Sequence, residues 1–283
     1  MVTIAGTLGS VLSADGTRIG YVTAGDGPAL LLVHGGMASR LGWAPVWPRL
    51  VNCFRVTAMD RRGRGSSTDG ARPHSLDAEY ADVAAVANAI RSGPDARVDV
   101  FGHSYGATCV LGAAAGGAPL RRVALYEPPG PQTVPAEWVS RAAGWIAAGE
   151  PGRAMWSFLV EVIGLTPKQV ESMRDTAADQ DWAQIVSTTL PREAKALAGV
   201  DLPALAARIS QPVLMLLGAD SPPWAEAITY ALHRGIPDAR AEVTVLAGQG
   251  HQAIDQAPDL VVDQLARFFG HSEDVDGADR KSL

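Results

Sequence analysis

Short apolar runs alternate with longer segments of helical spacing along most of the chain. Continuous apolar runs with the length of strands buried on both faces occupy residues 29–33, 54–59, 98–101, 122–126, 211–217 and 241–246. Helical patterns occupy residues 76–91, 224–234 and 258–269. Residues 10–24, which turn at Ala14-Asp15-Gly16, add a hairpin. The pattern therefore predicts an α/β fold with a mostly parallel, eight-stranded sheet flanked by helices.

The segment from residue 130 to 205 breaks this alternation. It has no strand-like run, several helical patterns and several tryptophans, and it lies between two strand-like runs. We expect it to form a helical lid inserted into a core made of residues 1–129 and 206–270. Residues 271–283 are polar and without apolar periodicity, so we expect a disordered tail.

A lid of this kind would close over the carboxyl edge of the sheet, where open α/β sheets bind ligands. Its large apolar side chains are candidates for an apolar acyl pocket: Trp138, Trp145, Met155, Trp156 and Phe158. The alternative is that these side chains only hold the lid helices together.

Residues 102–106 have the sequence Gly-His-Ser-Tyr-Gly, between a buried strand and a run of small residues that favours a helix. A G-x-S-x-G pattern in this context places the serine on a tight, strained turn with its hydroxyl exposed. Ser104 is therefore the candidate nucleophile. The backbone N–H of Tyr105, at the start of the helix, would point to where an oxyanion forms.

A second glycine-rich segment, residues 34–37, follows the strand at 29–33. Backbone N–H groups in such a loop can supply the second oxyanion donor, and Gly36 or Met37 is the candidate. We expect His34 to hold this loop by a hydrogen bond.

Two further polar residues follow strand ends, Asp220 and His251. The carboxyl ends of parallel strands meet at one edge of a sheet, so both should lie near Ser104. A neutral imidazole can take the proton of a serine hydroxyl, and a carboxylate on its other nitrogen fixes its tautomer. We expect Asp220 to be that carboxylate. Glu127, at the end of the strand that follows the serine turn, is the alternative acid.

The composition argues against several classes of function. The net charge is −6, no basic block suggests nucleic acid, and no apolar run approaches a membrane span. No cysteine and histidine cluster has metal-ligand spacing, so no metal is expected. The absence of signal-peptide features and the two cysteines, Cys53 and Cys109, expected to be buried thiols, favour a cytoplasmic protein. We expect the three arginines of residues 61–64 to be surface charges on a turn, with anion binding as the alternative, and we expect His74 at the surface.

Taken together, these motifs resemble the α/β-hydrolase superfamily over about residues 10–270, in its serine-nucleophile branch with a helical lid. The matching segments are 34–36, 60–66, 102–106, 218–220 and 250–251. The resemblance implies a triad of Ser104, His251 and Asp220, with an oxyanion hole at Tyr105 and the Gly36–Met37 segment. Relatives that open epoxides or displace halide carry an aspartate where this chain has Ser104, which disfavours those reactions.

The resemblance also implies the activity. We expect a serine hydrolase that cleaves a small-molecule carboxylic ester or lactone through an acyl-enzyme, with no cofactor. Thioester hydrolysis on acyl or polyketide-like chains and carbon–carbon bond hydrolysis are the alternatives, because the triad does not separate them. A non-hydrolytic binding protein or a lyase on the same fold is a further alternative.

Overall fold

A computed structural model of the chain describes residues 4–174 and 182–270. Its eight strands form one sheet in the order β1-β2-β4-β3-β5-β6-β7-β8, which confirms the predicted α/β fold and the number of strands. The strands are β1 Thr7–Leu12, β2 Arg18–Ala24, β3 Ala29–Val33, β4 Arg55–Met59, β5 Val98–His103, β6 Leu120–Tyr126, β7 Val213–Gly218 and β8 Ala241–Leu246. The pairs β1·β2 and β2·β4 are antiparallel, and the pairs from β4 to β8 are parallel.

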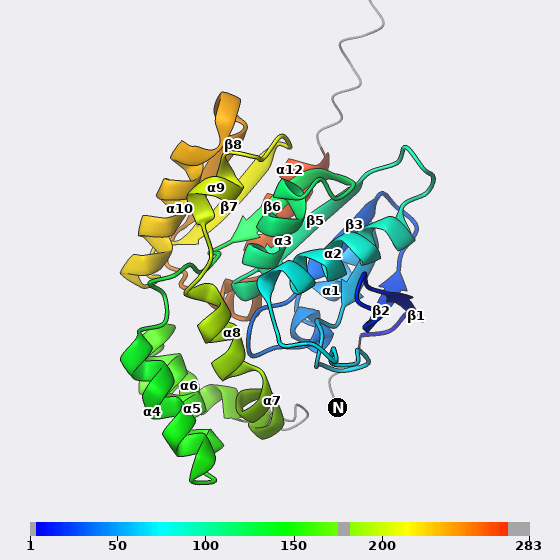
Figure 1. Cartoon of the computed structure of the whole chain (residues 1–283). Helices are drawn as coiled ribbons and strands as arrows, with labels where there is room; N and C mark the ends of the chain where they lie inside the picture. Colours follow the sequence, from blue (N-terminus) through cyan, green and yellow to red (C-terminus); the bar gives the residue numbers. More distant parts are fainter. Residues whose placement is uncertain (1–3, 175–181, 271–283) are drawn as a thin grey trace, which may run out of the picture.

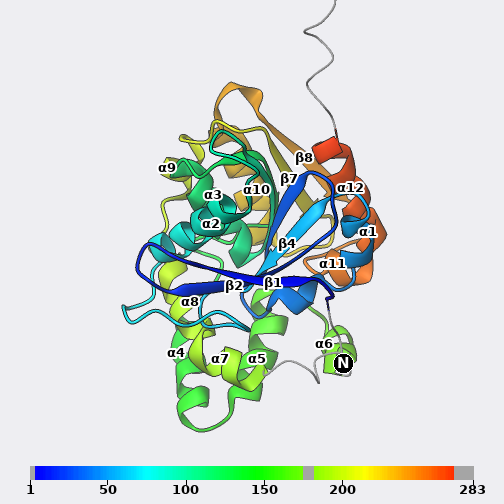
Figure 2. The same cartoon turned by 90° about the vertical axis from the view of Figure 1, so that its right-hand side faces the viewer.

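Helices cover both faces of the sheet (Figures 1 and 2). One face packs against α2 Leu76–Ile90, α3 Tyr105–Ala115, α9 Leu202–Ala206 and α10 Pro223–Gly235. The other packs against α1 Trp47–Val51, α11 Ala253–Gln256 and α12 Pro258–Gly270. Short helical turns are η1 Arg40–Trp43 and η4 Pro237–Ala239. Because both faces are covered, the central strands are apolar on both sides, which is why they read as continuous apolar runs.

The chain leaves the sheet after β6 and returns at β7. Between them lie α4 Ala136–Ala147, α5 Pro151–Ser157, η2 Phe158–Val162, α6 Pro167–Arg174, α7 Trp182–Thr188 and α8 Leu190–Leu197. Figures 1 and 2 show these inserted helices gathered at one end of the molecule. They share an apolar core of their own, which includes Trp138, Leu159 and Val186. An inserted helical segment is therefore present, whereas the expected tail, residues 271–283, lies outside the described residues.

The two cysteines differ from each other in environment. Cys109 is buried in α3 as expected, but Cys53 is exposed, which corrects the expectation for that residue. None of the helices that the structure describes has the length and apolar character needed to cross a membrane. No group of histidine, cysteine and carboxylate side chains suited to a metal ion occurs in the described part of the chain.

The turn between β5 and α3 depends on its two glycines. A Cβ at Gly106 would lie 2.3 Å from the carbonyl oxygen of Val33 and 2.4 Å from that of His34. A Cβ at Gly102 would lie 2.7 Å from the Cα of Ala107. These contacts are with backbone, which cannot move aside as a side chain can. Gly106 is therefore required for the close approach of β3 to the turn, and Gly102 for the close approach of the end of β5 to the start of α3.

This requirement gives a stability prediction with an internal control. We expect Gly106→Ala to lower the free energy of unfolding by about 3 kcal/mol or more, because the methyl group displaces backbone in the core. Gly144→Ala, in the exposed middle of α4 where a Cβ meets no atom within 4 Å, should instead raise it by roughly 0.5–1 kcal/mol. Urea unfolding followed by circular dichroism measures both, and a Gly106→Ala protein as stable as the wild type would contradict the argument.

Candidate active site

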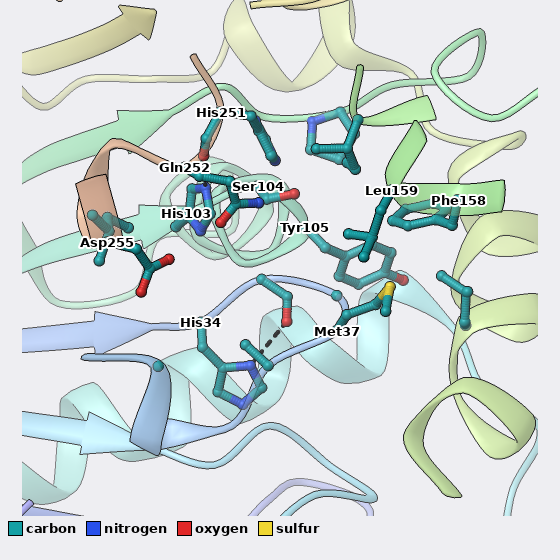
Figure 3. Close-up of a pocket in the computed structure, with 18 of the residues that line it drawn as sticks. His34, Met37, His103, Ser104, Tyr105, Phe158, Leu159, His251, Gln252 and Asp255 are labelled. Atoms are coloured by element: carbon teal, nitrogen blue, oxygen red, sulfur yellow. Dashed lines mark hydrogen bonds between the residues drawn. The ribbon is translucent and has the colours of Figure 1, made fainter. Parts of the chain in front are cut away.

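A cavity of about 490 Å³ lies where the loops after the strands face the inserted helices. It is lined by the serine turn, the glycine-rich loop after β3, the segment around His251, and apolar side chains from the inserted helices. Figure 3 shows Ser104, Tyr105, Met37 and His251 on its wall, with Phe158 and Leu159 on the side of the inserted helices. Four segments that are far apart in the sequence thus share one cavity.

Ser104 is held at the apex of the turn in an unusual backbone conformation. Its φ is 52° and its ψ −128°, and it caps α3. Its N–H donates to the carbonyl of Tyr126 at 2.8 Å, and its own carbonyl accepts from Ala107 at 2.8 Å. A non-glycine residue at positive φ is strained and is maintained by the surrounding structure. Tyr105 begins α3, so its N–H is one of those that have no partner within the helix.

His251 is hydrogen-bonded to Glu127. Its Nδ1 donates to Glu127 Oε2 at 2.5 Å, and the side chains of both are buried. The other carboxylate oxygen of Glu127 accepts from the backbone N–H of Gly218 at 2.7 Å and from the hydroxyl of Ser221 at 2.6 Å. Glu127 follows β6 directly and has a φ of 48°. The carboxylate is therefore fixed by three donors, and a neutral His251 carries its proton on Nδ1.

This pairing corrects the expectation that Asp220 would be the partner of His251. Asp220 is exposed, and its backbone N–H donates to the carbonyl of Gln249 at 2.9 Å. In the turn after β7 the side chain that faces inward is Ser221, which contacts Glu127. Glu127, the alternative acid of the sequence analysis, thus occupies the place that was expected for Asp220.

One histidine and two arginines hold the glycine-rich loop of residues 34–37 through hydrogen bonds. His34 Nδ1 donates to the carbonyl of Gly35 at 2.9 Å, and its Nε2 accepts from the N–H of Arg61 at 3.0 Å. Burial lowers the pKa of His34 well below its ordinary value, so it stays neutral in this arrangement. Arg61 Nη1 donates to the carbonyl of Gly35 at 3.1 Å, and Arg64 Nη2 donates to that of Gly36. His34 holds the loop as predicted.

The arginines of residues 61–64 are buried, contrary to the expected surface position. Arg61 contacts Glu79 and Glu193, Arg62 contacts Asp82 and Asp15, and Arg64 contacts Glu193. A buried charge is tolerated when it is paired and hydrogen-bonded. Since these partners lie on distant segments, the local sequence resembled that of a charged turn. Asp60, directly after β4, accepts from the N–H and hydroxyl of Ser66 in the same turn.

Two other histidines lie beside the site. His103 lines the cavity, and its Nε2 donates to the carbonyl of His251 at 3.0 Å. Burial, with a smaller contribution from His251, lowers the pKa of His103 to about 3. His74 was expected at the surface, but its side chain is buried and its Nε2 lies 3.1 Å from the hydroxyl of Tyr105.

The predicted pocket side chains separate into two groups. Phe158 lines the cavity, as proposed from the sequence. Trp138, Trp145, Met155 and Trp156 pack within the core of the inserted helices and are absent from the described cavity lining, so for them the alternative interpretation is correct.

Sequence reasoning missed two acidic residues of the cavity lining. Glu193 lies on α8, and Asp255 lies on α11. Figure 3 shows Asp255 near Gln252. Burial raises the pKa of Asp255 to about 6. A signal for Glu193 is present in the sequence, because it shares helical spacing with Leu190 and Leu197 and so falls on the apolar face of α8.

The eight-stranded sheet, the serine turn after β5 and the helices inserted between β6 and β7 together define the α/β-hydrolase fold class. The chain belongs to the alpha/beta hydrolase family, whose sequence profile matches residues 30–264.

Comparisons with individual proteins agree with this family assignment. An alpha/beta hydrolase from Sphaerobacter thermophilus has a TM-score of 0.78 and 35% identity, over 92% of this chain and 100% of that chain. An enol-lactonase from Burkholderia xenovorans has a TM-score of 0.73 over 92% of this chain and 100% of that chain, but its 21% identity shows the fold alone. N-formylmaleamate deformylase of Pseudomonas putida is 40% identical over 124 residues, which cover 43% of this chain and 45% of the relative.

A pyrrolizixenacetamide deacetylase of Xenorhabdus hominickii is 34% identical over 99 residues, 35% of this chain and 36% of the relative. The chain thus matches less than half the length of these curated relatives.

The lowered pKa of His103 gives a prediction for stability against pH. The pKa in the folded state, about 3, is below the ordinary value of 6.5, so the unfolded chain binds the proton first as the pH falls. His103 therefore makes the wild type lose stability between about pH 6.5 and pH 3, by at most about 1.4 kcal/mol per pH unit. Replacing it with glutamine, which retains a donor but does not titrate, should make the decline shallower over this window. Urea unfolding at several pH values measures the free energy of unfolding of both proteins. If it falls equally steeply with pH in the wild type and in the glutamine variant, the prediction is wrong.

Proposed function

We propose that this chain is a serine hydrolase that cleaves a carboxylic ester or lactone through an acyl-enzyme. The observation that carries the proposal is the buried hydrogen bond to Glu127 from His251, which lines the same cavity as Ser104. With its proton on Nδ1, a neutral His251 offers Nε2 as the base for the serine hydroxyl. The triad is therefore Ser104, His251 and Glu127.

The reaction follows from these roles. Ser104 attacks the carbonyl carbon while His251 takes its proton, and the imidazolium that forms is stabilised by Glu127. The N–H groups of Tyr105 and of the Gly36–Met37 segment hold the oxyanion. His251 then protonates the leaving group and activates the water that releases the acyl group. The inserted helices act as a lid that closes the cavity, and these steps use no cofactor.

We place ester or lactone cleavage first among the possible reactions because of the apolar lining of the cavity. It is lined by apolar side chains such as Leu159, Ile163 and Leu190 from the inserted helices, which suits an uncharged acyl chain. Thioesters and carbon–carbon substrates would use the same triad. The names of two relatives, a deformylase and a deacetylase, are the reason to include N-formyl and N-acetyl amides in a substrate panel with p-nitrophenyl esters, lactones and acyl thioesters.

The nucleophile can be tested without knowing the substrate. A fluorophosphonate probe should label the wild-type protein at Ser104, and peptide mass spectrometry should locate the adduct there. Labelling should disappear in Ser104→Ala. A folded wild-type protein that is not labelled would instead support a non-hydrolytic binding protein or a lyase.

The choice of carboxylate is tested by a matched pair of variants. Glu127→Gln should lower kcat by roughly 10³–10⁴-fold, because an amide neither fixes the tautomer of His251 nor stabilises the imidazolium. Asp220→Asn changes an exposed side chain and should alter kcat by less than about threefold. The kcat of both variants on the best ester of the panel decides between them, and the reverse order of severity would assign the role to Asp220.

A further inference from the structure

Glu193 lines the cavity and has a hydrogen-bond acceptor that no described residue uses. Its Oε1 accepts from Arg61 Nη2 at 2.6 Å and from Arg64 Nη2 at 2.8 Å. Its Oε2 is buried and has no hydrogen-bond partner among the residues that the structure describes. The side chain is 2% exposed, yet it belongs to the cavity lining. A buried carboxylate oxygen without a donor is costly, so this oxygen is a place where a ligand gains by donating.

The free oxygen lies close to the groups assigned to the oxyanion. A Cβ built on Gly36 would lie 3.3 Å from Glu193 Oε2 and 3.9 Å from the Cβ of Tyr105. Gly36 and Tyr105 belong to the two segments that would hold the oxyanion. A substrate whose carbonyl reaches those segments therefore brings its neighbouring carbon atoms near Glu193.

The charged residues that line the cavity favour a ligand with a hydrogen-bond donor over a ligand with a negative charge. The described residues of the lining include the acidic Glu193 and Asp255 but no lysine or arginine. The guanidinium groups of Arg61 and Arg64 contact Glu193 from behind and are not part of the described lining. A carboxylate on the substrate would therefore meet an acceptor without a compensating cation.

We propose that Glu193 is a substrate-binding residue, and that the acyl group of the substrate carries a hydroxyl or N–H donor beside the reacting carbonyl. This inference rests on the proposed function and names its substrate class: esters or lactones of hydroxy or amino acids. The donor binds Glu193 Oε2 while the carbonyl oxygen occupies the oxyanion hole.

Three esters with one leaving group test the proposal: p-nitrophenyl 3-hydroxybutyrate, 3-methoxybutyrate and butyrate. The wild type should prefer the hydroxy ester to the methoxy ester by about tenfold or more in kcat/KM, because only the hydroxyl can donate. In Glu193→Gln we expect the amide oxygen to stay with the arginines, which puts the amide N–H₂ group, a donor, in the place of Oε2. The hydroxy-to-methoxy ratio should then fall by about tenfold or more.

Glu79 provides the matched control. It also contacts Arg61, its side chain is 1% exposed, and it is not part of the described lining. Glu79→Gln disturbs the same charge cluster, so any change in rate should be equal for the hydroxy and methoxy esters. If Glu193 only anchors α8 and the loop, then Glu193→Gln will also leave the ratio unchanged, which would overturn the proposal.

Binding to Ser104→Ala separates this inference from the proposed function. Calorimetry should show that the intact hydroxy ester binds this variant about tenfold more tightly than the methoxy ester, whether or not wild-type Ser104 reacts with fluorophosphonate. Equal binding of the two esters would overturn the role of Glu193. If Glu193→Gln does not fold, two measurements still test the proposal: the hydroxy-to-methoxy ratio of kcat/KM in the wild type, and the ratio of the affinities of Ser104→Ala for the two esters.

Discussion

The hydrogen bond between His251 and Glu127 is the interaction on which the arrangement of the site depends. It joins the loop after β8 to the end of β6, and the same carboxylate ties down the turn after β7 through Gly218 and Ser221. One buried carboxylate therefore fixes three segments that the sheet alone would only bring near one another. Hydrogen bonds to a charged acceptor in a buried site are short and strong, which suits this task.

A second set of buried charges, Arg61, Arg64 and Glu193, holds the glycine-rich loop of residues 34–37. Arg61 and Arg64 donate to the carbonyls of Gly35 and Gly36, and both contact Glu193 on the inserted helices. Carbonyls that are held by arginines leave the N–H groups of the loop for the cavity. Since Glu193 belongs to the inserted segment, the position of these helices and the shape of the loop are coupled through two guanidinium groups.

The fold and much of the site could be predicted because their signals are local. Apolar runs mark the strands, and the glycines of residues 102–106 mark a turn that only small residues permit. The choice between Glu127 and Asp220 could not be made in this way, because both follow the ends of adjacent parallel strands, β6 and β7. It depends on which side chain turns inward, and that direction is set by the backbone at Glu127 and by the position of Ser221. Burial of the arginines likewise depended on partners far along the chain.

Ser104 and Glu127 are both non-glycine residues at positive φ, and they stand at the ends of neighbouring strands. Each such conformation costs of the order of 1–3 kcal/mol, which the rest of the fold must offset. Glycine at either position would relieve the backbone but would remove the hydroxyl or the carboxylate. Under the proposed mechanism, selection for stability and selection for activity therefore act in opposite directions at these two positions, and the most stable variant would be inactive.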